Sequence, residues 1–262
     1  MEGVSVRSRA KGRGLLVDLG IILGLLLIAL VAITIWSNTM SGNLLTYTLV
    51  EPLDGMTTAK VSINPGDGNM EIDSLTGSEQ ILAGGTLQYF EKQGTPNRSM
   101  EIMNGQASLT LEPGSGKQSW FRLPWAANNG ATEWQIHLNP KLVSDITAHS
   151  DGGNIKLNLA GMAVTRLSAD TGGGNIDVIL PNNTASLSVT AKTGAGNITV
   201  ELPGGVAARV HVATGLGKVI IDPRLSQVDK NTYQTPGFDE AAIKVEITAG
   251  SGAGNVSIGI RP

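Results

Sequence analysis

Cysteine is absent from the 262-residue chain, and aromatic residues make up only 4% of it. Without cysteine, neither a disulfide nor a thiolate-ligated metal site can form. The formal net charge is −3, so the chain lacks the basic excess that is typical of nucleic-acid-binding proteins, and no nucleic-acid partner is expected. What is abundant instead is glycine, with 34 residues.

Many of these glycines belong to a short phrase that recurs along the chain. The position that usually holds Asn is residue 69, 154, 175, 197, 218 or 255, and the steps between these positions are 85, 21, 22, 21 and 37 residues. A step near 21 indicates a repeat architecture, in which each unit is too small to bury its own apolar face. The copies are Gly66-Asp67-Gly68-Asn69-Met70, Gly152-Gly153-Asn154-Ile155, Gly172-Gly173-Gly174-Asn175-Ile176, Gly194-Ala195-Gly196-Asn197-Ile198, Gly215-Leu216-Gly217-Lys218-Val219 and Gly252-Ala253-Gly254-Asn255-Val256.

Apolar and polar residues alternate on both sides of each glycine phrase. Leu167, Ala169 and Thr171 precede the third copy, and Ile176 and Val178 follow it. This period of two predicts a strand, a glycine corner and a second strand in every unit. We therefore expect an all-β fold, a β-solenoid resembling a parallel β-helix with rungs of about 21 residues. Stacked β-hairpins are the alternative.

Polar residues at fixed positions favour the solenoid over the hairpins. The Asn series recurs at one position, and a hydroxyl residue stands four places before it in five copies. In stacked rungs each such side chain can bond its copy in the next rung. The glycine before the Asn is expected to need a positive φ or a close backbone approach, and Asn tolerates a left-handed conformation. These expected corner residues are Gly68, Asn69, Gly153, Asn154, Gly174, Asn175, Gly196, Asn197, Gly217, Gly254 and Asn255.

An apolar segment near the start predicts a membrane helix. Leu19 to Trp36 is a run of 18 residues without charge, and Arg7, Arg9, Lys11 and Arg13 precede it. By the positive-inside rule the N-terminus is cytoplasmic and the rest lies outside the cell. A cleaved signal peptide is the alternative. The expected organisation is a basic cytoplasmic tail (1–14), a single transmembrane helix (15–37), a juxtamembrane linker (38–54) and an extracytoplasmic β-repeat domain (55–262).

Two stretches interrupt the pattern. Residues 222–242 are polar and contain Pro223 and Pro236, so they are expected to be a loop leaving one rung. Residues 113–132 are rich in glycine and irregular. Three of the four tryptophans lie in or beside this second stretch, where an aromatic patch could bind a partner or cover the end of the stack. The candidate contact residues are Trp120, Phe121, Trp125 and Trp134.

The segments Trp134–Leu142, Gly152–Leu159 and Leu167–Pro181 resemble the toastrack domains of bacteria, a group of proposed adhesins. Such domains also form the extracytoplasmic part of membrane-bound regulators of envelope-stress signalling. The resemblance covers about residues 55–262 and implies a non-catalytic β-domain, often tethered to a membrane, that binds other envelope components. It implies no catalytic residue.

The residues themselves agree with a protein that is not an enzyme. The three histidines are far apart in the sequence, and no metal-ligand spacing stands out, so no metal or cofactor is expected. We expect a single-pass bacterial membrane protein whose outer domain binds an envelope protein or senses a signal. One alternative is a surface adhesin that binds glycans through the aromatic patch. Another is a polysaccharide-active β-helix enzyme, whose carboxylates would meet only in three dimensions.

Overall fold

The computed structural model describes residues 42–77, 80–116, 132–182 and 185–262. From Asn43 onward these residues belong to one compact unit. Apart from the short 3-10 helix η1 (Glu91–Gln93), every element in the described ranges is a strand. The strands are β1 (Leu44–Pro52), β2 (Thr58–Ile63), β3 (Asn69–Ser74), β4 (Ile81–Phe90), β5 (Asn97–Met103), β6 (Gln106–Glu112), β7 (Glu133–Leu138), β8 (Val143–Ser150), β9 (Ile155–Asn158), β10 (Ala163–Thr171), β11 (Ile176–Ile179), β12 (Leu187–Ala195), β13 (Ile198–Leu202), β14 (Ala208–Leu216), β15 (Val219–Ile221), β16 (Ser226–Asp229), β17 (Thr232–Gln234), β18 (Val245–Ala253) and β19 (Val256–Ile260).

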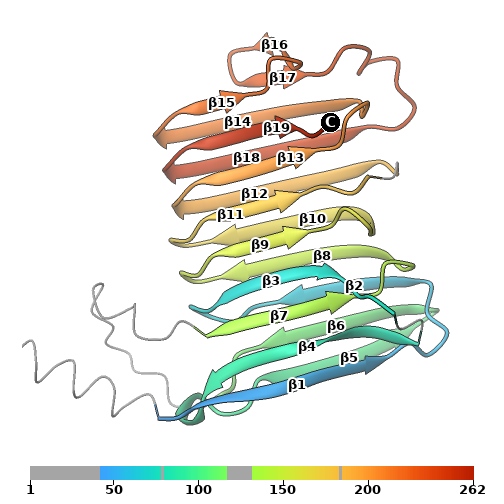
Figure 1. Cartoon of the computed structure of the whole chain (residues 1–262), viewed down its shortest axis with the longest axis vertical. Coiled ribbons are helices and arrows are strands. Elements are labelled where there is room, and N and C mark those ends of the chain that lie inside the picture. The colour runs from blue at the N-terminus through green and yellow to red at the C-terminus, as the bar shows by residue number, and fades with distance from the viewer. Residues whose placement is uncertain (1–41, 78–79, 117–131, 183–184) are drawn as a thin grey trace, which may run out of the picture. The chain divides into compact units, whose positions relative to one another are not determined.

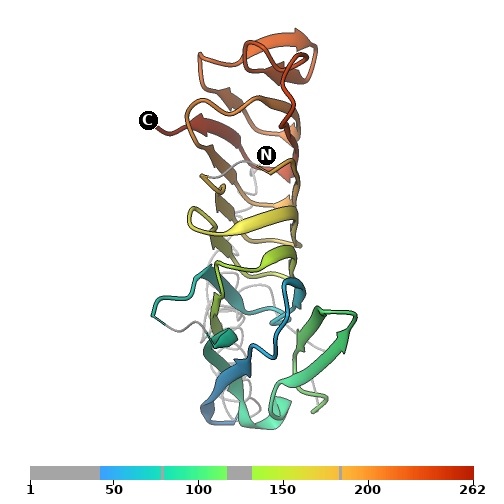
Figure 2. The same ribbon diagram turned by 90° about the vertical axis from the view of Figure 1, so that its right-hand side faces the viewer.

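The strands form two largely parallel sheets (Figures 1 and 2). Sheet A has the order β1-β4-β7-β3-β9-β11-β13-β19-β15, and sheet B has the order β16-β17-β14-β18-β12-β10-β8-β2-β6-β5. Two strands joined by a glycine corner lie in different sheets and together form one rung. The strands of one rung pair in parallel with those of the next, as β10 does with β8 and β12. The arrangement is β-solenoid-like, and the alternative of stacked hairpins is wrong.

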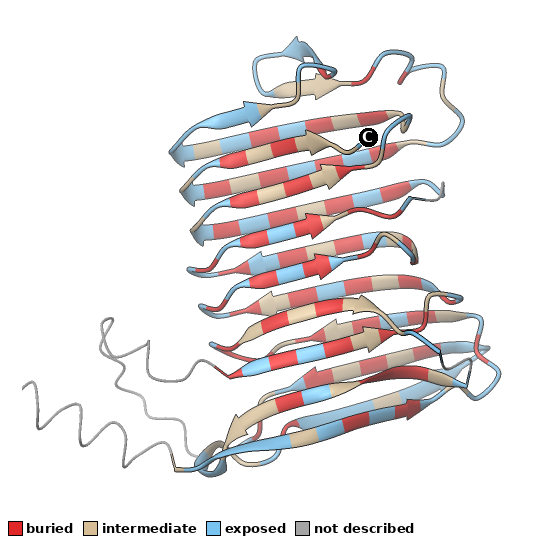
Figure 3. Ribbon diagram, in the orientation of Figure 1, coloured by how far each residue is buried: buried red, intermediate tan, exposed pale blue. Residues whose placement is uncertain are grey.

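Burial alternates along the strands as the sequence predicts (Figure 3). In β12, Leu187, Val189 and Ala191 are buried, and Ser188 and Lys192 are exposed. The inward side chains of both sheets join one apolar cluster that runs through the rungs. Each rung therefore hides its aliphatic residues against its neighbours, which explains why a unit of this size is stable only in a stack.

The order of rungs in space differs from their order in the chain. The rungs follow one another as β6/β7, β2/β3, β8/β9, β10/β11, β12/β13, β18/β19 and β14/β15. The first rung in the sequence and the last one each lie between two others. The expected loop at 222–242 is therefore wrong in part, because it contains the hairpin β16–β17 and carries the chain back so that β18/β19 can insert.

Antiparallel strands cover several edges of the parallel stack. Strand β4 pairs with β7, β5 pairs with β6, and β17 pairs with β14. Strand β1 then pairs with β4, although Leu44–Pro52 falls inside the stretch expected to be a linker. Leu44–Pro52 is therefore part of sheet A, and residues 38–41 of the expected linker lie outside the described ranges.

No helix in the described ranges is long and apolar enough to span a membrane. The expected transmembrane helix at 15–37 lies outside those ranges.

Candidate functional site

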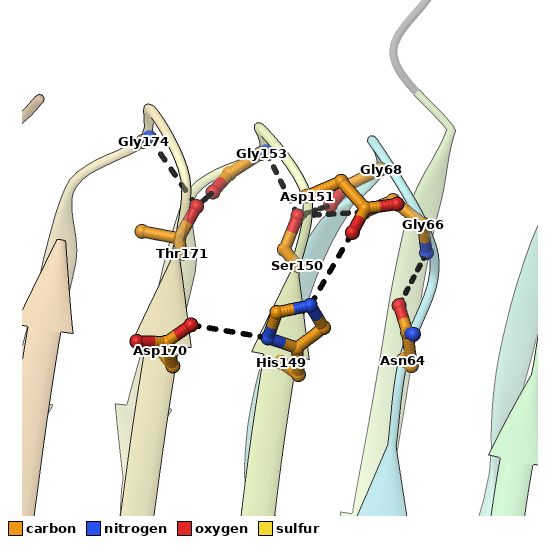
Figure 4. Close-up of polar contacts among 10 residues, drawn as sticks. All are labelled: Asn64, Gly66, Gly68, His149, Ser150, Asp151, Gly153, Asp170, Thr171 and Gly174. Carbon is orange, nitrogen blue, oxygen red and sulfur yellow. Dashed lines mark hydrogen bonds and ion pairs between the residues drawn. The ribbon is translucent and has the colours of Figure 1, made fainter. Parts of the chain in front are cut away.

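The glycine corners carry the most regular polar contacts of the described structure. In five strands of sheet B, β8, β10, β12, β14 and β18, a hydroxyl side chain near the corner donates a hydrogen bond to the carbonyl oxygen of the corner glycine in the neighbouring rung; Figure 4 shows two of these bonds, from Ser150 and Thr171. These bonds are Ser150 to Gly68 at 3.0 Å, and Thr171 to Gly153, Thr193 to Gly174, Ser251 to Gly196 and Thr214 to Gly254, each at 2.8 Å.

The Asn residues form a second ladder beside the hydroxyls. The side-chain Oδ1 of Asn154 accepts the backbone N–H of Asn175 at 2.9 Å, and Oδ1 of Asn175 accepts the N–H of Asn197 at 2.8 Å. The series continues through Asn255 and ends at Lys218, whose N–H donates to Oδ1 of Asn255. The contact expected between a side chain and its own copy is wrong in detail, because each side chain bonds the backbone of the next rung.

Close packing of neighbouring corners explains the glycine before each Asn. A Cβ atom on Gly174 would lie 2.0 Å from the carbonyl oxygen of Gly153, a distance at which no side chain fits. Positive φ is not the general reason: among these corner glycines it occurs only at Gly217 and Gly254. Nor do the ladder Asn residues adopt left-handed backbone, since Asn104 is the one non-glycine residue with positive φ in the described ranges.

One exposed histidine bridges two carboxylates beside the corners. His149 Nε2 lies 3.3 Å from Asp151 Oδ1, and its Nδ1 lies 3.2 Å from Asp170 Oδ1 (Figure 4). His149 and Asp170 are neighbours on adjacent parallel strands. Exposed pairs of this kind contribute little to stability. Within the part of the chain that the structure describes, no group of three or more His, Cys, Asp or Glu residues could hold a metal ion.

The other charged contacts on the surface also pair neighbouring strands or turns. Lys156 Nζ lies 2.7 Å from Glu71 Oε1, and this hydrogen bond raises the pKa of Lys156. Hydrogen bonds from Arg224 hold the pKa of Asp222 well below its usual range. His137 contacts Asp73, and His211 Nδ1 lies 3.2 Å from Thr232 Oγ1. Each histidine thus has a local partner, a carboxylate for His137 and His149 and a hydroxyl for His211.

Two apolar hollows lie over the turns opposite the corners. Their volumes are about 580 and 320 Å³, and Leu202, Pro203 and Val206 line both. Arg224 is the one charged residue in their described lining, and Asp222 already binds its guanidinium. A small-molecule site usually adds several convergent polar groups to an apolar pocket. These hollows lack that combination.

The predicted aromatic patch divides at the limit of the described ranges. Trp120, Phe121 and Trp125 lie outside them. Trp134 lies in β7, is 2% exposed, and its Nε1–H donates to the carbonyl oxygen of Gln88 at 3.0 Å. Trp134 therefore packs in the core and presents no surface to a ligand.

Parallel rungs, stacked corners and a continuous aliphatic interior define an all-β repeat scaffold. The chain belongs to the toastrack family, since residues 40–201 match the family described as the N-terminal domain of toast_rack, DUF2154.

The fold is also similar to that of solved structures. A proposed cell adhesion protein from Clostridium sporogenes shares 22% identity with this chain at a TM-score of 0.75, and the match covers 84% of this chain and all of the other. A proposed adhesin from Bacteroides fragilis has 12% identity and a TM-score of 0.32 over 82% of this chain and 97% of its own. The first likeness shows a shared fold. No protein of curated function matches the chain significantly.

Proposed function

We propose that this chain is a non-catalytic, membrane-anchored module outside the bacterial cell membrane that binds another protein of the envelope. The observation that carries this proposal is that the recurring polar residues form hydrogen bonds between rungs. The Asn and hydroxyl ladders bond neighbouring rungs to each other, so they build a scaffold and converge on no reacting group. A rigid scaffold with a regular surface suits recognition of a macromolecule.

The sequence supplies the other supports. The apolar run from Leu19 to Trp36 follows a basic tail, which supports a location of the repeat domain outside the cell membrane. Toastrack domains also occur in membrane-bound regulators of envelope stress. We therefore propose that binding by this chain modulates such a response.

Crosslinking of the full chain in its native membranes tests the proposal. Photo-reactive residues at exposed positions such as Lys192 and Ile220 should yield a discrete adduct with one membrane protein. The same residue at buried Ile176 serves as a control and should yield none. Adducts with lipid alone at every exposed position would refute a protein-binding role.

A second candidate function is adhesion, in which the chain would bind glycans; the similar protein of Clostridium sporogenes is a proposed cell adhesion protein. The three aromatic residues Trp120, Phe121 and Trp125 are the candidates for stacking on sugar rings. The full chain in detergent micelles should then bind a glycan array, and Trp120→Ala or Trp125→Ala should abolish the signal. Tyr89→Ala, an aromatic change in β4, is the control and should leave it unchanged.

The remaining alternative is a polysaccharide-active enzyme. The charged contacts described above pair across the surface, which supports a role without catalysis. Release of reducing ends from envelope polysaccharides by the purified chain would overturn that part of the proposal.

A further inference from the structure

The parallel stack has four edges, and three of them are covered by antiparallel strands. Strand β4 covers β7 in sheet A, β5 covers β6 in sheet B, and β17 covers β14 in sheet B. The fourth edge is β15 in sheet A, which pairs only with β19 among the described residues. Sheet B extends two strands beyond β14 at this end, whereas sheet A stops at β15 (Figure 1).

Exposure shows that no described segment covers the last rung. Val219 stands at an inward ladder position next to Val256, Ile198, Ile176 and Ile155. Those four side chains are fully buried, whereas Val219 is 38% exposed. Ile220 points to the outer face of the same strand and is 52% exposed. The edge therefore exposes to solvent an apolar side chain, Val219, at a position that the neighbouring rungs bury, and Ile220 adds to this apolar surface.

The backbone at this edge also has free bonding groups. Lys218 accepts a hydrogen bond from Val256, and Asp222 donates one to Ile258, so the even-numbered residues face β19. Since peptide groups alternate along a strand, the N–H and C=O of Val219 and Ile221 point away from β19. No described residue bonds them. An extended segment placed here would find two donors and two acceptors at the spacing of a strand.

The β16–β17 hairpin extends sheet B past β15, and this arrangement leaves room for one added strand rather than for a second copy of this chain. Tyr233 of β17 lies opposite Val210, on the inward face of sheet B, and is partly buried against the core. Antiparallel self-pairing of β15 would place two copies one strand apart, at about 4.8 Å, with both β16–β17 hairpins on the same face of sheet A, where these hairpins, each two strands deep, would collide. A single added strand meets no such obstacle.

We propose that β15 is a strand-addition site for an extended segment of the partner protein, which pairs antiparallel with Val219–Ile221 and covers them with apolar side chains at alternate positions. This inference rests on the proposed function, whose partner it describes. The antiparallel direction follows the three edges that the chain covers itself. Addition of a strand to an open sheet edge is a general way to recognise extended peptides.

Hydrogen exchange on the full chain in detergent micelles tests the site directly. The probe is the blocked peptide Lys-Thr-Val-Thr-Val-Thr-Lys, and its control has proline in place of the central Thr. At saturation the amides of Val219 and Ile221 should exchange at least about tenfold more slowly, while Ile220, already bonded to β19, should change less than about twofold. Equal slowing at all three amides, or none, would overturn the proposal. So would slowing that depends on protein concentration without peptide, which would assign the edge to a second copy.

Matched variants test the same backbone group. Ile221→Pro removes an outward N–H and leaves the bonds to β19, so it should weaken peptide binding at least about tenfold. Asp177→Asn changes an exposed side chain of β11, in the same sheet but away from β15, and should stay within about threefold. If Ile221→Pro lowers the melting temperature sharply, Val219→Asp replaces it, since it removes the apolar contact at a partly exposed position. Wild-type affinity in the folded variant refutes strand addition.

The membrane crosslinking separates failure of this inference from failure of the proposed function. A partner captured equally by wild type and Ile221→Pro would keep the binding role and reject the β15 site. Capture of no protein by either would reject the binding role itself.

Discussion

The two ends of the rung stack are closed in different ways. At the β6/β7 end, β4 and β1 cover sheet A and β5 covers sheet B. Arg98 of β5 then donates to the buried carboxylate of Glu51 in β1 at 2.6 Å, and this ion pair joins the outermost strands of the two sheets. At the β14/β15 end, among the described residues, a cover lies over sheet B only. The difference shows that the chain can close an edge with its own strands, and that no strand in the described ranges closes the edge at β15.

The rungs between the ends are alike, and their shared weakness is the corner. Gly174→Val should lower the free energy of unfolding by about 3 kcal/mol or more, because its Cβ would meet the Gly153 carbonyl at 2.0 Å. Gly205, in a turn with φ +79° and no atom near its Cβ position, is the control. Gly205→Ala should cost only about 1 kcal/mol. Urea unfolding of the two variants measures the contrast. Similar losses would mean that corners and turns are equally tolerant, and that corner packing is not the reason for Gly174.

A matched pair of valines sharpens the comparison between a covered rung and the open one. Val256 and Val219 occupy the same ladder position in adjacent rungs, but Val256 is fully buried and Val219 is 38% exposed. Val256→Ala should cost about 2–3 kcal/mol, because it leaves a cavity in the core. Val219→Ala should cost less than about 1 kcal/mol. Equal losses in denaturant unfolding would show that something covers β15 in the isolated protein.

The Asn ladder offers a smaller test of the same difference. Asn175→Ala removes the acceptor for the N–H of Asn197 and should cost about 1 kcal/mol. Lys218 ends the ladder. Its backbone N–H takes part, but its ammonium group cannot accept a hydrogen bond from a further rung, so Lys218→Ala should be neutral within about 0.5 kcal/mol. Thermal unfolding of both variants checks this. A clear loss for Lys218→Ala would contradict its position as the last step.

The sequence predicted what repeats and missed what breaks the repeat. Period-two alternation and the fixed positions of Asn175 and Thr171 were enough to predict stacked rungs, because the same contact recurs at every step. The order of the rungs could not be read in this way. Near-identical copies such as those at Asn197 and Asn255 pair equally well with several neighbours, so spacing alone does not show that β18/β19 inserts before β14/β15.

One signal of the stack's end was nevertheless present in the sequence. Lys218 stands where the other copies have Asn, and a residue with no further rung to bond does not need the amide oxygen. The open edge at β15 depends on the same fact. The corner glycines show what the sequence could not reveal. A recurring glycine in a repeat can mean either a positive φ or a close backbone neighbour, and the distance from a Cβ on Gly174 to the carbonyl oxygen of Gly153 identifies the close neighbour as the cause.

The smallest expected effect concerns the connection that leaves the open edge. Arg224 Nε and Nη2 donate to the Asp222 carboxylate at 2.9 and 2.8 Å, and Asp222 Oδ2 also accepts the N–H of Ile260 at 3.1 Å. These bonds lower the pKa of Asp222 in the folded state, with the Arg224 hydrogen bonds as the main cause. The folded protein therefore binds this proton more weakly than the unfolded chain does. The stabilisation is fully present above the unfolded pKa, about 3.9, and is lost as pH falls toward the lower folded value.

Melting temperatures of wild type and Asp222→Asn should differ by a constant amount from about pH 7 to pH 5, and the difference should begin to shrink below about pH 4. Because all other carboxylates titrate alike in both proteins, their difference isolates this one group. A gap that persists unchanged to pH 2 would show that Asp222 contributes through its shape and neutral hydrogen bonds, so that charge does not hold this end of the stack together.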